Sequence, residues 1–550
     1  MPQQLKQRID YPRTAAEELT PLIAASSAYT TASTPSELHR SMPPDMTSPQ
    51  VRASDTRRVY LDAAEVVERE GPVDEAKQRR AGQMAMVSSA LGIFCDLYFL
   101  TLINLVKDLV GEARGVPLTV HEKSLLGSVI YVGTVLGQLC FGTFADQIGR
   151  RVICIVTCIC MMIGALGSSL SVHTSWCSLT AMLCAFQLLL GFGIGGEYPL
   201  SASVTSESSS PETSGRRAAT VYSMMGVGGL VSPLVIWSLL SAGLSARLTW
   251  RLSLAIGCLP CLLAFTVRWN MMESDRFRAT SALRRQKGSF YRYLKRLRFH
   301  LVGTAVAWAV YDIVIYGIGT FMGEITVLLN LGSGPKAEAL NTLAITAFSS
   351  PGYALSIVLV ETLGRKNCQT AGFTGMGVFF GLLAVALGVW GVDGTPAMIK
   401  VTLFTLAMAC NAAGPGMSTY VIPGEFFPSV VKGTFHGISA ASGKMGAVLG
   451  GFMYAYLTVE PQWITMAVSG GLSLIGAVWT IIFIPQYSVR ELRSRLEEEK
   501  SDILSSYMTT NDQALLDLSP SPDGGASDST YTAGRQSPTL QGGVTNGDRR

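Results

Sequence analysis

Charge is scarce in this chain, and neither disulfide-like cysteine spacing nor an amino-terminal signal peptide is visible. Only 15% of the 550 residues are charged and 48% are hydrophobic, whereas a soluble domain has about 25% charged residues. Water therefore does not solvate most of the chain. The net charge of +4 is small for this length and predicts no nucleic-acid partner.

The cysteines argue against a disulfide-stabilised protein, and the first 80 residues argue against an amino-terminal signal peptide. The eleven cysteines mostly lie inside apolar runs, as Cys154, Cys158 and Cys160 do, which is typical of small buried residues in a reducing or lipid setting. The polar first 80 residues predict that insertion depends on the first spanning helix. No nucleophile–base set or metal-ligand cluster appears in the sequence, so we expect neither an enzyme nor a bound cofactor.

Long apolar runs dominate the chain. A spanning helix needs about 20 mostly apolar residues, because it crosses about 30 Å of hydrocarbon at about 1.5 Å per residue. Twelve such runs lie at 85–108, 124–146, 152–171, 176–200, 217–241, 250–269, 300–329, 338–361, 368–390, 397–422, 433–457 and 463–485. The sequence therefore predicts an all-α, multi-pass integral membrane protein with twelve transmembrane helices.

These runs form two groups of six. We expect an amino-terminal six-helix half at 85–269, a basic cytoplasmic linker at 270–299 and a carboxyl-terminal half at 300–485. The flanking segments are polar and of low complexity, so we expect a disordered tail at 1–84 and a largely disordered one at 486–550.

Lys and Arg are concentrated in every second connection between the runs. The sixth connection contains nine of them, Arg276, Arg278, Arg284, Arg285, Lys287, Arg292, Lys295, Arg296 and Arg298. Cytoplasmic loops carry this excess. Both termini are therefore predicted to be cytoplasmic, as an even number of helices requires, and we expect the plasma membrane.

An internal repeat relates the two halves. Similar residues recur at a nearly constant offset of 213 to 218 positions, in the pairs Asp96/Asp312, Asp146/Glu361, Glu207/Glu425 and Trp250/Trp463. Such repeats predict two homologous halves, and transporters of this kind bind solute near the midplane, where the halves meet.

Several motifs resemble those of a known family of transporters. GQLCFGTFADQIGRR at 137–151 is similar to the signature loop of the major facilitator superfamily. Further stretches resemble its phosphate:proton symporters, at 191–207, 250–277, 351–373, 414–428 and 436–447. Glu197 and the stretch WAVYDIVIY at 308–316 are more similar to glycerophosphodiester carriers of the same family. The resemblance implies the superfamily's fold of two pseudo-symmetric six-helix halves.

The seventh run contains a carboxylate at bilayer depth. Asp312 lies four residues after Trp308 and four before Tyr316, which places all three on one helix face. An intramembrane carboxylate normally lines a cavity or relays protons. The resemblance implies that these three residues bind solute and proton, and the alternative is a structural hydrogen bond from Asp312.

The resemblance adds four residues to this site. It implies proton transfer at Asp96, solute or proton binding at Glu197 and Tyr198, and a site role for Lys444, which could instead be a snorkelling cation. It also implies cytoplasmic gate ion pairs at the helix ends, formed by Asp146, Arg150, Glu207, Glu361, Arg365 and Glu425.

Four positions depart from the phosphate-carrier pattern. Phosphate carriers usually have an arginine at the position of Gln187 and a glutamine at that of Met225. They usually have an asparagine at the position of Gly416 and a glutamate at that of Thr157. These changes remove a cation and several hydrogen-bonding groups that suit a compact phosphate.

The function that these observations predict is secondary transport of a small polar solute coupled to protons, with lipid as the surrounding partner. Inorganic phosphate or a phosphate-bearing metabolite is the expected solute. A glycerophosphodiester, a sugar or polyol, or another organic solute is an alternative, and a nutrient-sensing receptor is a third possibility. The proton would be the coupling ion, without a metal or nucleotide.

Overall fold

The structure is a computed structural model that describes residues 75–116, 118–273, 277, 289–320, 322, 332–457, 460–499 and 501–502. Most of each expected tail lies outside the described residues, as do 274–276 and 278–288 of the expected basic linker. Ala81–Arg550 forms one compact unit, and the description below concerns that unit.

The described residues of this unit are helical, without a strand. The helices are α4 (Glu75–Arg114), α5 (Val120–Gln147), α6 (Arg150–Ser169), α7 (Leu179–Glu207), α8 (Ser214–Ser241), α9 (Ala246–Ile256), α10 (Cys258–Trp269), α13 (Ser289–Thr320), α15 (Pro335–Ser349), α16 (Pro351–Thr362), α17 (Arg365–Gly394), α18 (Ala397–Ala413), α19 (Pro415–Phe426), α20 (Lys432–Leu457) and α21 (Gln462–Phe483). A further short helix covers 489–499.

Eleven stretches of the described chain are long and apolar enough to cross a membrane. Three of them combine two consecutive helices, α9 with α10, α15 with α16 and α18 with α19. Pro351 and Pro415 begin α16 and α19, and proline interrupts a helix there because it has no N–H to donate.

The remaining predicted span, at 433–457, corresponds to α20, which is 26 residues long. It contains Lys444 and six glycines, so it is more polar than the other spans, yet it packs along both α5 and α13. A helix that is covered by other helices can carry such residues, because lipid does not have to solvate them. The predicted all-α membrane fold is confirmed; among the described residues, eleven of the twelve predicted spans are long and apolar enough to cross a membrane, and α20 occupies the position of the remaining one.

Two helices begin about ten residues before the predicted runs. α13 begins at Ser289, inside the segment that we expected as linker, and α4 begins at Glu75. Hydropathy marks only the apolar part of a helix, whereas the backbone hydrogen bonds continue into the polar flank. The short helix 489–499 likewise lies within the expected tail at 486–550.

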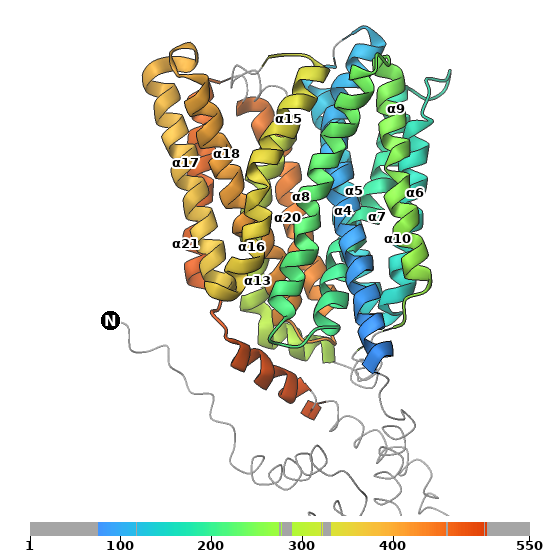
Figure 1. The fold of residues 1–550 in the computed structure, drawn as a ribbon, viewed down its shortest axis with the longest axis vertical. Coiled ribbons are helices and arrows are strands. Elements are labelled where there is room, and N and C mark those ends of the chain that lie inside the picture. Colours follow the sequence, from blue (N-terminus) through green and yellow to red (C-terminus); the bar gives the residue numbers. More distant parts are fainter. Residues whose placement is uncertain are drawn as a thin grey trace, which may run out of the picture. The chain divides into compact units, whose positions relative to one another are not determined.

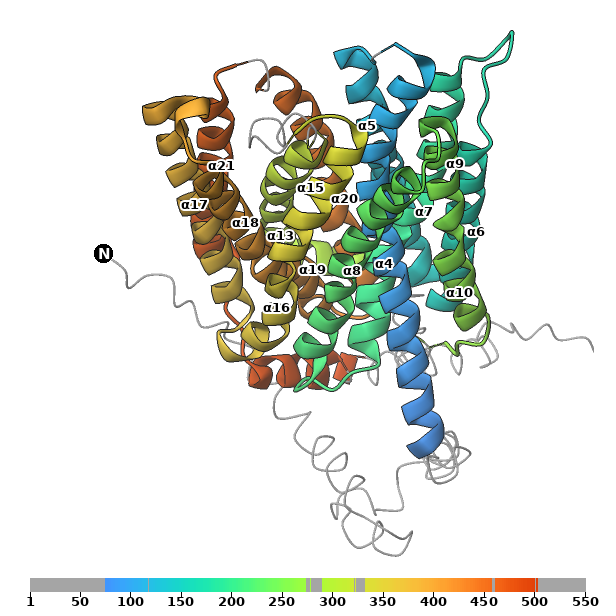
Figure 2. The same ribbon diagram turned by 45° about the horizontal axis from the view of Figure 1, so that its top comes forward.

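The amino-terminal helices α4–α10 and the carboxyl-terminal helices α13–α21 lie side by side (Figures 1 and 2). Between the two groups, α5 packs on α20, and α8 packs on α15 and α16. The backbones of α5 and α20 nearly touch, because a Cβ atom on Gly437 would lie 2.4 Å from the carbonyl oxygen of Gln138. Small residues permit such close helix contacts.

The outer helices present apolar side chains away from the protein. On α6 the exposed positions recur every three or four residues, at Val152, Val156, Ile159, Ile163 and Leu166. This spacing forms one continuous face of the helix, and a face of this kind suits contact with lipid tails.

Candidate functional site

A buried ion pair lies between α13 and α20. The Nζ atom of Lys444 is 3.1 Å from Oδ2 of Asp312, and both side chains are fully buried. Lys444 is therefore directed into the protein toward a carboxylate and does not reach a helix end as a snorkelling cation would.

Aromatic side chains surround this pair. Lys444 Nζ lies 3.7 Å from the ring centroid of Tyr316 and 5.1 Å from that of Tyr198. The two tyrosine hydroxyls are 3.4 Å apart. The ring of Trp308 meets that of Tyr198 edge-on, with the ring centroids 5.7 Å apart. Tyr198, Trp308, Asp312, Tyr316 and Lys444 are called the central cluster below. The four-residue spacing on α13 predicted that its three members would meet.

Asp96 of α4 borders the central cluster. Its side chain is fully buried, and no described group makes a hydrogen bond of ordinary geometry to either carboxylate oxygen. Lys444, Tyr198, Glu197 and Asp312 are among the groups that interact electrostatically with it. The structure therefore places Asp96 where its charge acts on the central ion pair.

Glu197 is held by a residue that sequence reasoning missed. Arg268 of α10 donates to both Glu197 oxygens, at 2.8 Å to Oε1 and 2.5 Å to Oε2. Thr157 donates to Oε1 at 2.8 Å. Both Glu197 oxygens thus have hydrogen-bond partners outside the central cluster, and its role in binding solute or proton stays a prediction. An arginine within the apolar run 250–269 was the available signal, because a buried cation needs a partner.

Two of the four departures from the phosphate-carrier pattern, Thr157 and Met225, contact these residues. Met225 Sδ is 3.9 Å from the Tyr198 hydroxyl. A Cβ atom on Gly416 would lie 2.5 Å from the hydroxyl oxygen of Tyr222 and 3.1 Å from that of Tyr311. Tyrosine hydroxyls therefore occupy the space that a longer side chain at position 416 would need.

One charged cluster lies where α5 ends and α6 begins. Gly149 adopts a φ of 124°, which brings Arg150 to the first turn of α6. Arg150 lies 2.8 Å from Glu207 and 3.1 Å from Asp146. Asp146 also accepts hydrogen bonds from the backbone N–H groups that begin α20, at 3.1 Å and 2.7 Å. This Arg150 cluster thus joins the amino-terminal helices to α20.

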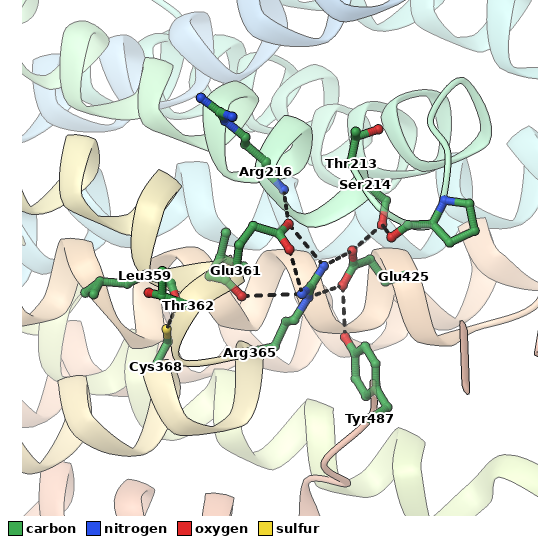
Figure 3. A network of polar contacts seen from close by, with 12 residues as sticks. Thr213, Ser214, Arg216, Leu359, Glu361, Thr362, Arg365, Cys368, Glu425 and Tyr487 are labelled. Atoms are coloured by element: carbon green, nitrogen blue, oxygen red, sulfur yellow. Dashed lines mark hydrogen bonds and ion pairs between the residues drawn. The ribbon is translucent and has the colours of Figure 1, made fainter. Parts of the chain in front are cut away.

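A related cluster lies at the start of α17 (Figure 3). Arg365 donates to both oxygens of Glu425 at 2.8 Å and lies 3.5 Å from Glu361. The Ser214 hydroxyl donates to Glu425, and the backbone N–H of Arg216 donates to Glu361 at 2.9 Å. This Arg365 cluster therefore joins α8 to α16 and α19.

The two clusters correspond to the six residues that the repeat and the resemblance singled out. Each consists of an arginine, an acidic residue four positions before it and an acidic residue at the end of another helix. Each also bonds across the two groups of helices. Their role as gates stays a prediction, since contacts of this kind are also found in purely structural networks.

The short helix 489–499, drawn in dark red in Figure 1, packs near these clusters. Glu499 accepts a hydrogen bond from the Ser429 backbone N–H at 2.7 Å. Arg493 donates to Glu212 in the loop between α7 and α8, and this bond holds the pKa of the Glu212 carboxyl below its ordinary value. Sequence reasoning missed these contacts, because the segment has no apolar run.

Another contact lies beyond the central cluster, toward the other ends of the helices. The Lys107 side chain of α4 donates to the carbonyl oxygen of Thr320 at the last turn of α13. A cation is favourable there because it meets the negative end of the helix dipole. The central cluster is therefore bracketed by contacts between the two groups of helices.

The chain matches the model of a known protein family. Residues 83–295 and 325–496 match the family model described as "Sugar (and other) transporter". The chain belongs to this transporter family. The predicted membership in the major facilitator superfamily is confirmed, and so is the prediction of a multi-pass membrane protein.

Similar proteins carry related names. "Inorganic phosphate transporter 1-6" of Oryza sativa subsp. japonica is 32% identical over 456 residues, which cover 71% of this chain and 85% of the relative. "Probable inorganic phosphate transporter 1-6" of Arabidopsis thaliana is 30% identical, covering 78% of this chain and 96% of the relative. These names agree with the resemblance to phosphate carriers.

Solved structures show the fold. The proton:xylose symporter XylE bound to 6-bromo-6-deoxy-D-glucose matches with a TM-score of 0.63 at 17% identity, covering 76% of this chain and 99% of XylE. A partially occluded inward-open XylE from E. coli matches at 0.60 and 16%, covering 74% and 98%. At these identities the likeness concerns the fold alone.

Proposed function

We propose that this transporter imports inorganic phosphate together with protons. The observation that carries the proposal is the buried Lys444–Asp312 pair beside the rings of Tyr198 and Tyr316, whose hydroxyls lie 3.4 Å apart. A lysine cation and tyrosine hydroxyls are suitable ligands for phosphate oxygens. The relatives that are named inorganic phosphate transporters support this choice of solute.

The ion pair offers a way to link the proton to the solute. While Asp312 is ionised, its charge compensates Lys444 and repels an anion. When Asp312 takes up a proton, the lysine cation loses its counter-charge and can bind phosphate. Asp96, close enough to act on the same lysine, would serve as a second proton acceptor. The coupling ion is then the proton, and neither a metal nor a nucleotide is needed.

The two charged clusters would hold one end of the transporter closed. Both join the amino-terminal helices to the carboxyl-terminal ones through side chains that are mostly buried. Binding of solute and proton would favour a rearrangement in which these contacts break and the two groups of helices rock about the central cluster.

The excess of Lys and Arg at the clustered end supports an orientation with that end and both termini in the cytoplasm. Uptake from outside would then run from the Lys107 end toward the Arg150 and Arg365 clusters. The plasma membrane is the location that suits a phosphate importer.

A second candidate is an organic solute that carries a phosphate ester or several hydroxyls. It is favoured by Met225, which places a thioether beside Tyr198, and by Gln187, which supplies no cation. Such a solute would need apolar contact as well as anion ligands. A nutrient sensor is less well supported, because sensing does not require buried carboxylates that exchange protons.

The test is uptake by the purified protein in liposomes. With an acidic exterior, labelled phosphate should accumulate above its equilibrium level, and a protonophore should abolish the excess. Unlabelled glycerophosphodiesters, sugar phosphates and polyols serve as competitors. If a phosphate ester or polyol is accumulated and phosphate is not, the second candidate replaces the first; the absence of any gradient-driven accumulation would contradict both.

A further inference from the structure

The Glu197–Arg268 pair lies one helical turn from Asp96. The pair packs against α4 at Gly92, which precedes Asp96 by four residues and therefore lies on the same helix face as Asp96. A Cβ atom on Gly92 would lie 1.8 Å from Glu197 Oε2 and 2.5 Å from Arg268 Nη2. Only glycine at this position leaves room for the pair.

Arg268 has further partners that fix its position. Its guanidinium donates to the carbonyl oxygen of Cys154 at 2.9 Å and to the hydroxyl of Ser88 at 3.2 Å, besides the two Glu197 oxygens. The side chains of both Arg268 and Glu197 are buried from solvent. A guanidinium stays protonated under all physiological conditions, so its planar fork holds an ionised carboxylate in a single orientation.

The proton site at Asp96 is crowded with other ionisable groups. Six ionisable side chains from four other helices interact electrostatically with Asp96, and they are Tyr131, Glu197, Tyr198, Asp312, Tyr316 and Lys444. A second carboxylate in this neighbourhood could also take up a proton. It would then change both the number of protons carried and the charge that Asp96 experiences.

We propose that Arg268 withdraws Glu197 from proton exchange, so that Asp96 is the single carboxylate of the amino-terminal helices that loads and releases a proton. Arg268 and Gly92 are positioning residues in this account, because they act through Glu197 and touch neither solute nor the exchanging proton. The inference rests on the proposed proton coupling.

The decisive variants differ in whether Glu197 keeps Arg268 as its cationic partner. In Arg268→Gln the buried carboxylate loses its counter-ion and must take up a proton or move, which adds a titrating group beside Asp96. The pH at which uptake is half-maximal should then shift by about one unit or more. The double variant Glu197→Gln/Arg268→Gln removes both charges and keeps amides of similar shape, so its pH profile should return toward that of the wild type.

Gly92→Ala tests the same point without changing any charge. The added methyl group displaces the pair, so this variant should shift the pH profile in the same direction as Arg268→Gln. Gly82→Ala is the matched control on the same helix, because a Cβ atom there meets nothing within 4 Å. It should leave the profile unchanged.

The experiment measures phosphate uptake against external pH in liposomes for all these variants. A double variant that transports phosphate but no longer accumulates it with the gradient would show that Glu197 itself carries a proton. Folded Arg268→Gln and Gly92→Ala proteins with the wild-type pH profile would show that the pair only supports packing. Either result overturns the inference, and the double variant decides if Arg268→Gln does not fold. A wild-type protein without gradient-driven uptake would instead contradict the proposed function.

Discussion

Replacing Arg365 by Gln should slow transport while leaving solute binding nearly intact. In the structure Arg365 holds the carboxylate of Glu425 with two hydrogen bonds of 2.8 Å. That carboxylate and Glu361 accept the two bonds from α8, donated by Ser214 and by the backbone N–H of Arg216 (Figure 3). Arg365 therefore orients the two carboxylates that accept the hydrogen bonds from α8, and these bonds join the two groups of helices.

The size of the effect follows from these two bonds. A hydrogen bond to a charged group contributes about 1.5–3 kcal/mol, so the two bonds together favour the joined state by about 3–6 kcal/mol. Without Arg365 the carboxylates can turn toward water, and we expect about half of this stabilisation to be lost. A loss of about 1.5–3 kcal/mol changes the ratio of joined to separated states by roughly 10-fold to 150-fold.

The assay compares two properties of the same preparation. Uptake into liposomes should fall by about tenfold or more, whereas the phosphate dissociation constant in detergent should change by less than about threefold, since the central cluster is untouched. Arg216→Gln is the matched control, because the exposed Arg216 contacts Glu361 only through its backbone N–H. Its uptake should stay near that of the wild type.

This reasoning would be refuted if Arg365→Gln lost phosphate binding as completely as a variant of Lys444 does. Equal slowing in Arg216→Gln would also contradict it, because the loss would then reflect surface charge at this end and not the orientation of the two carboxylates.

Three further predictions concern the Arg365 cluster, the central ion pair and the topology. Gly215→Ala should reproduce the Arg365→Gln phenotype, because its Cβ would lie 2.0 Å from the Arg365 guanidinium, whereas Gly381→Ala, with nothing within 4 Å, should transport normally. Lys444→Gln should lower stability by about 3–5 kcal/mol by leaving a buried charge unpaired, and adding Asp312→Asn should recover most of the loss in thermal unfolding. Labels at positions 20 and 530 should be reachable only after permeabilisation, and external labelling of one of them would contradict the topology.

Much of the architecture could be predicted because hydropathy and repetition are local properties of the sequence. The apolar runs predicted the spans, and the constant offset predicted that Arg150 and Arg365 would have equivalent surroundings. The spacing of Trp308, Asp312 and Tyr316 predicted their common face, since helix geometry is fixed at about 3.6 residues per turn.

The Glu197–Arg268 pair could not be predicted in the same way. Its members are 71 residues apart on α7 and α10, so neither helix period nor the repeat relates them. The cost of burying a charge predicts that each needs a partner, but it does not say which one. The helix starts of α4 and α13 were placed too late for a different reason, since polar helical turns carry no hydropathy signal.

The central claim is that Asp312 couples the proton to the solute, and Asp312→Asn tests it most directly. The amide keeps the shape of a protonated carboxyl and removes the charge beside Lys444. The measurement compares exchange of labelled phosphate between equal internal and external pools with its accumulation under an inward proton gradient. The account predicts measurable exchange and no accumulation above equilibrium. Accumulation equal to that of the wild type would contradict it and leave Asp96 as the carboxylate that carries the coupling.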